Sequence, residues 1–155
     1  MTAVSEAGSS RRAATAPRHL AARAGLAIVA LAQAEIAIWG LLSPHSFYTS
    51  YPGAGHHWVS ALGPYNEHLI RDFAAAELGF AVLLLGTAIW FSRTLVLVAG
   101  AAFLAATLPH FAYHLTTTDS FSTGDNLASL GGFAVEVVVV IAAMVAVSRD
   151  SAIGD

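Results

Sequence analysis

The residues with the greatest capacity for chemistry lie between positions 66 and 79, at the start of a long apolar segment. His68 and Asp72 are four positions apart, as are Glu67 and Arg71, so in a helix each pair lies on one face. An imidazole and a carboxylate at this spacing can bind one metal ion, and a carboxylate and a guanidinium can form an ion pair. Ionisable groups in or near a bilayer are costly, which makes these residues candidates for function.

Two further imidazoles, His110 and His114, have the same spacing near the end of another apolar segment. With His68 and Asp72 they form our candidate metal site. The chain has no cysteine, so the donors are nitrogen and oxygen, which suit Zn, Fe, Mn or Cu(II); haem on the two histidines is a further option. The alternative for each pair is structural, as interfacial histidines or as a hydrogen-bonded pair that closes a helix end.

Three carboxylates are expected deep inside apolar helices: Glu35, Glu77 and Glu136. Each lies about 12–13 Å from the expected outer end of its helix, at about 1.5 Å per residue. Inserting one charged residue at the bilayer centre costs about 2.5–3.5 kcal/mol, so these groups need neutralising. Arg71 (with Glu67 as its nearest partner), protons or a metal ion can each do so. Glu77 lies opposite His68 on the helical wheel, so it can instead face Glu35 through a shared proton.

The composition is that of a membrane protein. Of the 155 residues 56% are hydrophobic and 11% charged, the mean hydropathy is +0.65 and the net charge is −3, whereas about 25% of residues are charged in soluble domains. We expect transmembrane helices at about residues 24–42, 67–91, 94–114 and 127–147. With an outer loop at 43–66 and otherwise short connections, these predict an all-α, up-down four-transmembrane-helix bundle over residues 20–147.

The arginines predict the orientation. Residues 1–19 are basic and lack apolar periodicity, which predicts a disordered cytoplasmic tail, and residues 148–155 form a second tail. With the N-terminus inside, six of the seven arginines are cytoplasmic, so we expect a multi-pass protein of the cell (plasma) membrane, N-in and C-in, with His-rich loops outside. In the alternative, residues 1–34 are a cleaved signal peptide ending in Ala-Gln-Ala, although the apolar run continues to Leu42.

The loop histidines, His45, His56 and His57, are expected to be solvated or to form a pH-responsive surface. Aromatic residues in the same loop suit the bilayer interface. A short helix lying in the interface is expected near residues 57–62.

Four short helices, a polar loop after the first, and Arg71-Asp72 at the start of a glycine-containing second helix resemble the DoxX-like membrane proteins. The resemblance covers the hydropathy of about residues 20–147. It implies a small four-helix bundle from a largely uncharacterised family, some of whose members associate with respiratory or thiol-redox complexes. Because this chain lacks cysteine, a thiol-linked role does not carry over, and no catalytic residue is transferred.

We therefore expect a small integral membrane protein whose outer His/carboxylate site binds a cation, either a metal ion or a proton, in an accessory, transport or sensing role. One alternative is a metal-dependent membrane oxidoreductase or hydrolase, so the question of an enzyme stays open. Another is a structural subunit whose acids pair with a partner's arginine. The expected partners are the bilayer and another membrane protein or a second copy; nothing indicates nucleic acid. Each expectation requires the acids and imidazoles to meet in one extracytoplasmic pocket.

Overall fold

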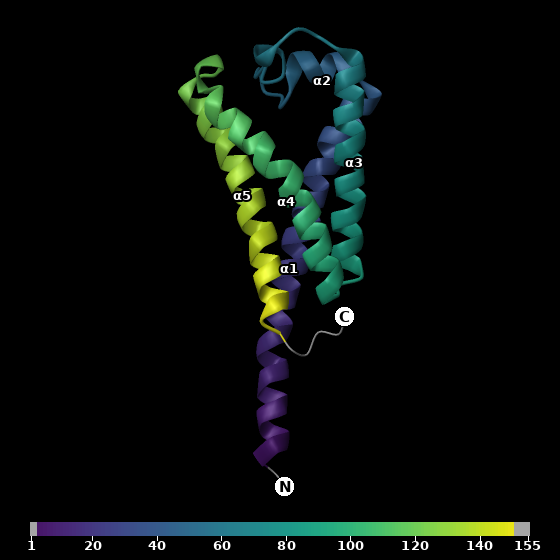
Figure 1. Cartoon of the computed structure of the whole chain (residues 1–155), viewed down its shortest axis with the longest axis vertical. Helices are drawn as coiled ribbons and strands as arrows, with labels where there is room; N and C mark the ends of the chain where they lie inside the picture. Colours follow the sequence, from purple (N-terminus) through teal and green to yellow (C-terminus); the bar gives the residue numbers. More distant parts are fainter. Residues whose placement is uncertain (1–2, 151–155) are drawn as a thin grey trace.

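The computed structural model describes residues 3–150, with side chains from His19 onward, and over this range the chain is helical with no strand. The long helices are α1 (Ala3–Leu42), α3 (Glu67–Ile89), α4 (Arg93–Thr116) and α5 (Thr123–Ser148). A short helix, α2 (Pro44–Ser50), and two single 3₁₀ turns, η1 (Ser60–Leu62) and η2 (Thr118–Ser120), lie in the connections. Figure 1 shows α2 at one end of the molecule and the start of α1 at the other.

Four segments are long and apolar enough to cross a membrane: His19–Leu42, Glu67–Ile89, Arg93–Thr116 and Thr123–Ser148. They confirm the four apolar helices that the sequence predicts, with boundaries that differ by a few residues. Helix α1 begins at Ala3 and so includes most of the segment expected to be a disordered tail. Alanine and arginine have high helix propensity, which an analysis of apolar periodicity does not detect.

Side-chain caps begin three of the helices where the sequence changes from polar to apolar. Asn66, the predicted cap of α3, accepts a hydrogen bond from the Leu69 backbone N–H at 3.1 Å. Ser92 and Ser122 cap α4 and α5 in the same way. These caps satisfy N–H groups that have no partner within the helix, and they define the short connections before α4 and α5.

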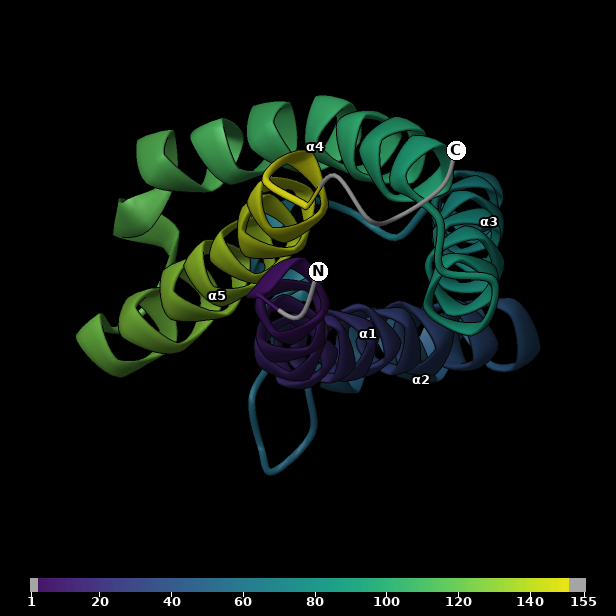
Figure 2. The same ribbon diagram turned by 90° about the horizontal axis from the view of Figure 1, so that it is seen from below.

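The bundle is tight at one end and spread at the other. Helix α1 packs closely on α3, with Gly40 so near α3 that a Cβ there would lie 2.7 Å from the Ala74 Cβ. Helices α4 and α5 pack together and diverge from α1 and α3 towards α2 (Figure 1; Figure 2 shows the same bundle from below). We call the end that carries α2 and η2 the open end. The closed end carries His19, the α3–α4 connection and Asp150.

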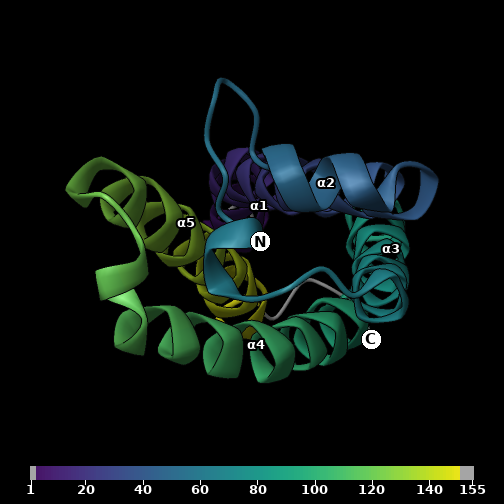
Figure 3. The same ribbon diagram turned by 90° about the horizontal axis from the view of Figure 1, so that it is seen from above.

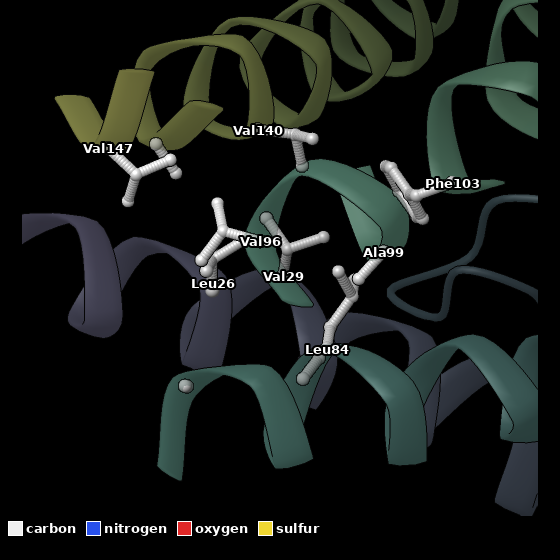
Figure 4. Close-up of a cluster of buried hydrophobic side chains, with 11 residues drawn as sticks. Leu26, Val29, Leu84, Val96, Ala99, Phe103, Val140 and Val147 are labelled. Carbon is white, nitrogen blue, oxygen red and sulfur yellow. The ribbon is translucent and has the colours of Figure 1, made fainter. Parts of the chain in front are cut away.

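The hydrophobic core fills the closed end. Side chains from all four long helices meet there (Figure 4): Leu26, Val29, Leu84, Val96, Ala99, Phe103, Val140 and Val147. Polar contacts tie the same end together. The Arg23 guanidinium donates to the carbonyls of Ala88 at 2.8 Å and Ile89 at 3.1 Å, and His19 Nε2 lies 2.9 Å from Asp150 Oδ2. Because the apolar packing is concentrated at this end, side chains do not fill the open end.

Candidate ligand-binding cavity

A cavity of about 700 Å³ occupies the open end, and all the helices contribute to its lining. Its walls are mostly apolar and rich in aromatic rings, including Phe47, Tyr51, Trp58, Phe73, Phe80 and Phe133. Cavities of about 300–1,000 Å³ with apolar walls and a few polar groups are typical small-molecule sites. The open end therefore has the size and the lining of a binding site.

The deep part of the cavity carries acidic and amide side chains from three helices. Glu77 of α3, Glu136 of α5 and Gln33 of α1 all line it, and Gln33 Nε2 donates a hydrogen bond of 2.9 Å to Glu136 Oε1. Gln33 is only 4% exposed. No arginine is among the lining residues. The polar groups in this part of the cavity are therefore mainly oxygen acceptors, and within the described residues no arginine side chain faces them.

Two imidazoles form a pair on the wall that α4 contributes. The Nε2 atoms of His110 and His114 lie 3.2 Å apart. The His110 ring packs between those of Phe73 and Phe133, with centroid distances of 5.8 and 4.9 Å. His114 is 8% exposed, and its Nδ1 has no hydrogen-bond partner among the described residues. The predicted pairing of these residues on one helix face is therefore present, as a hydrogen-bonded pair.

The segment from Tyr51 to Asn66, which we call the roof, crosses the open end of the bundle (Figure 3), and several of its residues line the cavity. The Tyr51 ring packs on Phe47 and Trp58, at centroid distances of 4.8 and 6.1 Å. The pKa of the Tyr51 phenol is raised to about 12, and burial is the largest cause. The negative charges of Glu35, Glu136 and Glu77 contribute the rest of the increase. Carboxylates from α1, α5 and α3 thus all act on one side chain of the roof.

One carboxylate attaches the roof to α5. Asp125 Oδ1 accepts hydrogen bonds from Trp58 Nε1 and His56 Nδ1, each at 2.6 Å, and Asp125 Oδ2 accepts one from Ser122 Oγ at 2.6 Å. We call these four residues the clasp. His57 Nδ1 donates to the Thr49 carbonyl at 2.5 Å. His56 and His57 are both exposed, as expected for solvated loop residues, and each also makes a hydrogen bond that helps to fix the roof.

The three intramembrane carboxylates divide into two environments. Glu77 and Glu136 line the same cavity, whereas Glu35 is exposed and is not in the lining. The polar side chain that α1 contributes to the cavity is that of Gln33, and not that of Glu35 as expected. Two positions along a helix correspond to about 200°, so the two side chains cannot share a face. The partner across the cavity from Glu77 is consequently Glu136 and not Glu35.

The four candidate metal ligands do not come together. His68 and Asp72 form a pair at 3.4 Å with side chains that are 88% and 63% exposed, away from the cavity that His110 and His114 line. Among residues 19–150, whose side chains the structure describes, there is no group of three or more His, Asp or Glu side chains that could hold a metal ion. The geometry of α3 explains why His68 is far from the cavity: Glu77 faces the cavity, and His68 lies on the opposite side of the helix. The two α4 imidazoles bond to each other, an arrangement that does not suit haem held by both.

The expected ion pair between Glu67 and Arg71 is present, with Nε to Oε1 at 2.9 Å. Arg71 also donates to the carbonyl of Leu41 at 2.6 Å, at the end of α1. Arg71 therefore joins α3 to α1 at the surface. It does not neutralise the carboxylates of the cavity.

Three important residues are absent from the candidates that the sequence suggests: Gln33, Trp58 and Asp125. A sequence pattern could have indicated that Gln33 faces the bundle interior. The small residues Ala37 and Gly40 follow it at helical spacing, and in the structure both are buried. The clasp had no such signal, since Trp58 and Asp125 are 67 positions apart.

Comparisons with protein-family models, with curated proteins and with solved structures find no match for this chain. The resemblance to DoxX-like proteins therefore stays a prediction.

Proposed function

We propose that this protein is an N-in/C-in, up-down membrane bundle that binds a cation from the extracytoplasmic side, in an accessory, transport or sensing role. Glu77 and Glu136 are the anionic groups of the site, and Gln33 positions Glu136. The observation that carries the proposal is that carboxylates from α3 and α5 line one cavity in which no arginine faces them.

A charged residue at the bilayer centre costs about 2.5–3.5 kcal/mol, and two ionised carboxylates in one cavity also repel each other. A bound cation offsets both costs, and a proton competes with it for the same oxygens. Competition of this kind is what a proton-linked transport or sensing role requires.

The geometry gives less support to a metal-dependent oxidoreductase or hydrolase. A catalytic zinc site uses three protein ligands, and the donors described here come in pairs: His68 with Asp72 at the surface, and His110 with His114 on the wall. The positions of the arginines support an orientation with the open end outside. The lipid bilayer is the partner that the four apolar helices favour.

The test is calorimetric titration of the protein in lipid nanodiscs with Zn²⁺, Na⁺, methylammonium and 2-phenylethylammonium. We expect saturable binding of at least one cation, lost in the double variant Glu77→Gln/Glu136→Gln. Glu35→Gln is the matched control, because it removes an exposed acid that is not part of the lining. If no cation binds, or if binding survives the double substitution, the proposed function is wrong.

A further inference from the structure

We infer that the cation is an amphipathic organic ammonium ion, a protonated amine on an aromatic or aliphatic body. This inference rests on the proposed function and names the class of ligand for the same cavity. The size of the cavity, the chemistry of its wall and its hydrogen-bonding capacity all support this inference.

The size of the cavity is the first argument. A volume of about 700 Å³ far exceeds what a bare metal ion or a small ammonium ion occupies. If such an ion bound alone, the remaining space would hold water against apolar walls or stay empty, and both are unfavourable. An occupant with a substantial apolar body fills the space that the diverging helices leave.

The wall is the second argument. Aromatic rings from several elements face the cavity, among them Tyr51 and Trp58 of the roof, Phe73 and Phe80 of α3, and Phe133 of α5. Aromatic faces attract ammonium groups and pack against apolar bodies. An inorganic cation, with its tightly held hydration shell, makes no use of such a wall.

Hydrogen-bonding capacity is the third argument. Gln33 donates its amide N–H to Glu136, which leaves the amide oxygen of Gln33 available as an acceptor. The polar groups in the deep part of the cavity are then mainly acceptors, namely this oxygen and the two carboxylates. A primary ammonium group carries three donors and a positive charge, and so complements them.

The test compares three probes in nanodiscs by calorimetry: 2-phenylethylammonium, methylammonium and the uncharged 2-phenylethanol. We expect 2-phenylethylammonium to bind at least about tenfold more tightly than either of the others, because only it combines the charge with a buried ring. Glu77→Gln/Glu136→Gln should remove its advantage over the alcohol. Phe73→Leu, which keeps the wall apolar, should weaken the binding of 2-phenylethylammonium more than that of methylammonium, because only the former has a ring that packs against Phe73.

The outcomes separate this inference from the proposed function. If methylammonium binds as tightly as 2-phenylethylammonium and both depend on the two glutamates, the ligand class is wrong while the cation site stands. If the alcohol binds as tightly as the amine, the carboxylates do not select charge and the inference fails. If neither ammonium ion shows glutamate-dependent binding and the other cations also fail, the proposed function itself is overturned.

Discussion

At the scale of single residues, Tyr51 reports on the cavity most directly. Its ring lies in the roof between Phe47 and Trp58, and burial, with the negative charges of three glutamates, raises its pKa to about 12. The neutral phenol is therefore the favoured form in the folded protein. The contribution of this group to stability is fully present below pH 10 and is lost as the pH rises through about 12.

We predict that the tyrosinate absorbance of the wild type contains one late step, near pH 12, that Tyr51→Phe removes. Glu77→Gln/Glu136→Gln should lower the pKa of Tyr51 only in part, because burial is the larger cause. If Tyr51 ionises near its ordinary pKa of 10.0 instead, the roof does not enclose it and the description of the cavity is wrong.

The sequence predicts which residues are candidates for function better than it predicts the direction in which their side chains point. The polar residues of the cavity are visible in the sequence as ionisable groups in apolar segments, and Glu77, Glu136, His110 and His114 were identified on that ground. Their grouping depends on the angle at which each helix faces its neighbours. This angle separates Glu35 from the lining and sends His68 to the opposite face of α3.

At the scale of elements, the clasp holds the roof to α5. Asp125 accepts three side-chain hydrogen bonds, and two of them come from the roof. Hydrogen bonds to a charged acceptor are stronger than those between neutral groups. The position of the roof over the cavity thus depends strongly on one carboxylate.

We predict that Asp125→Ala accelerates amide hydrogen exchange in residues 51–64 by about tenfold or more, because it releases Trp58 and His56 together. Asp119→Ala is the matched control. Asp119 is exposed in η2, and its side chain makes no hydrogen bond or ion pair within the described residues. Equal exchange in the two variants would show that the clasp does not hold the roof.

Helices α1 and α3 meet at a glycine. A Cβ at Gly40 would lie 2.7 Å from the Cβ of Ala74, a contact that only a shift of one helix can relieve. We predict that Gly40→Ala lowers the free energy of unfolding by about 1–3 kcal/mol through overpacking, measured by denaturation in detergent micelles.

The control for this prediction is Gly79→Ala. Gly79 also lies inside a helix, but a Cβ there meets nothing within 4 Å. We expect that change to be neutral or stabilising by up to about 1 kcal/mol, from helix propensity alone. If both alanine variants behave alike, α1 and α3 do not approach as closely as described.

The long helices could be predicted from the sequence because each is an apolar run of spanning length between polar caps. The connection after α1 was harder, because α2 has only seven residues and its length is too short for apolar periodicity. The interfacial helix expected near residues 57–62 is a single 3₁₀ turn at Ser60–Leu62. The divergence of α4 and α5 from α1 and α3 depends on tertiary packing, and no local pattern indicates it.

At the scale of the whole molecule, packing changes along the bundle. The closed end holds the apolar core and the contacts of Arg23 and His19, and the open end holds the cavity and its roof. This division suits the proposed function, in which the closed end keeps the helices together and the open end binds the ligand. The orientation in the membrane decides which side supplies that ligand.

The absence of cysteine from the chain allows a clean test of orientation. Ser120→Cys places one thiol in η2 at the open end, and Ser148→Cys places one at the end of α5. In intact cells, we expect a membrane-impermeant maleimide to label the Ser120→Cys protein. The Ser148→Cys protein should react only after permeabilisation. The reverse pattern would place the cavity on the cytoplasmic side.

The most direct test of the account is an experimentally determined structure of the protein with 2-phenylethylammonium bound. We predict that the ammonium nitrogen lies within hydrogen-bond distance of the Glu77 or Glu136 carboxylate, with the ring among the aromatic side chains beneath the roof. An ammonium ion bound at an exposed acid such as Glu35, or a cavity filled by a lipid chain with the two carboxylates turned away, would contradict it.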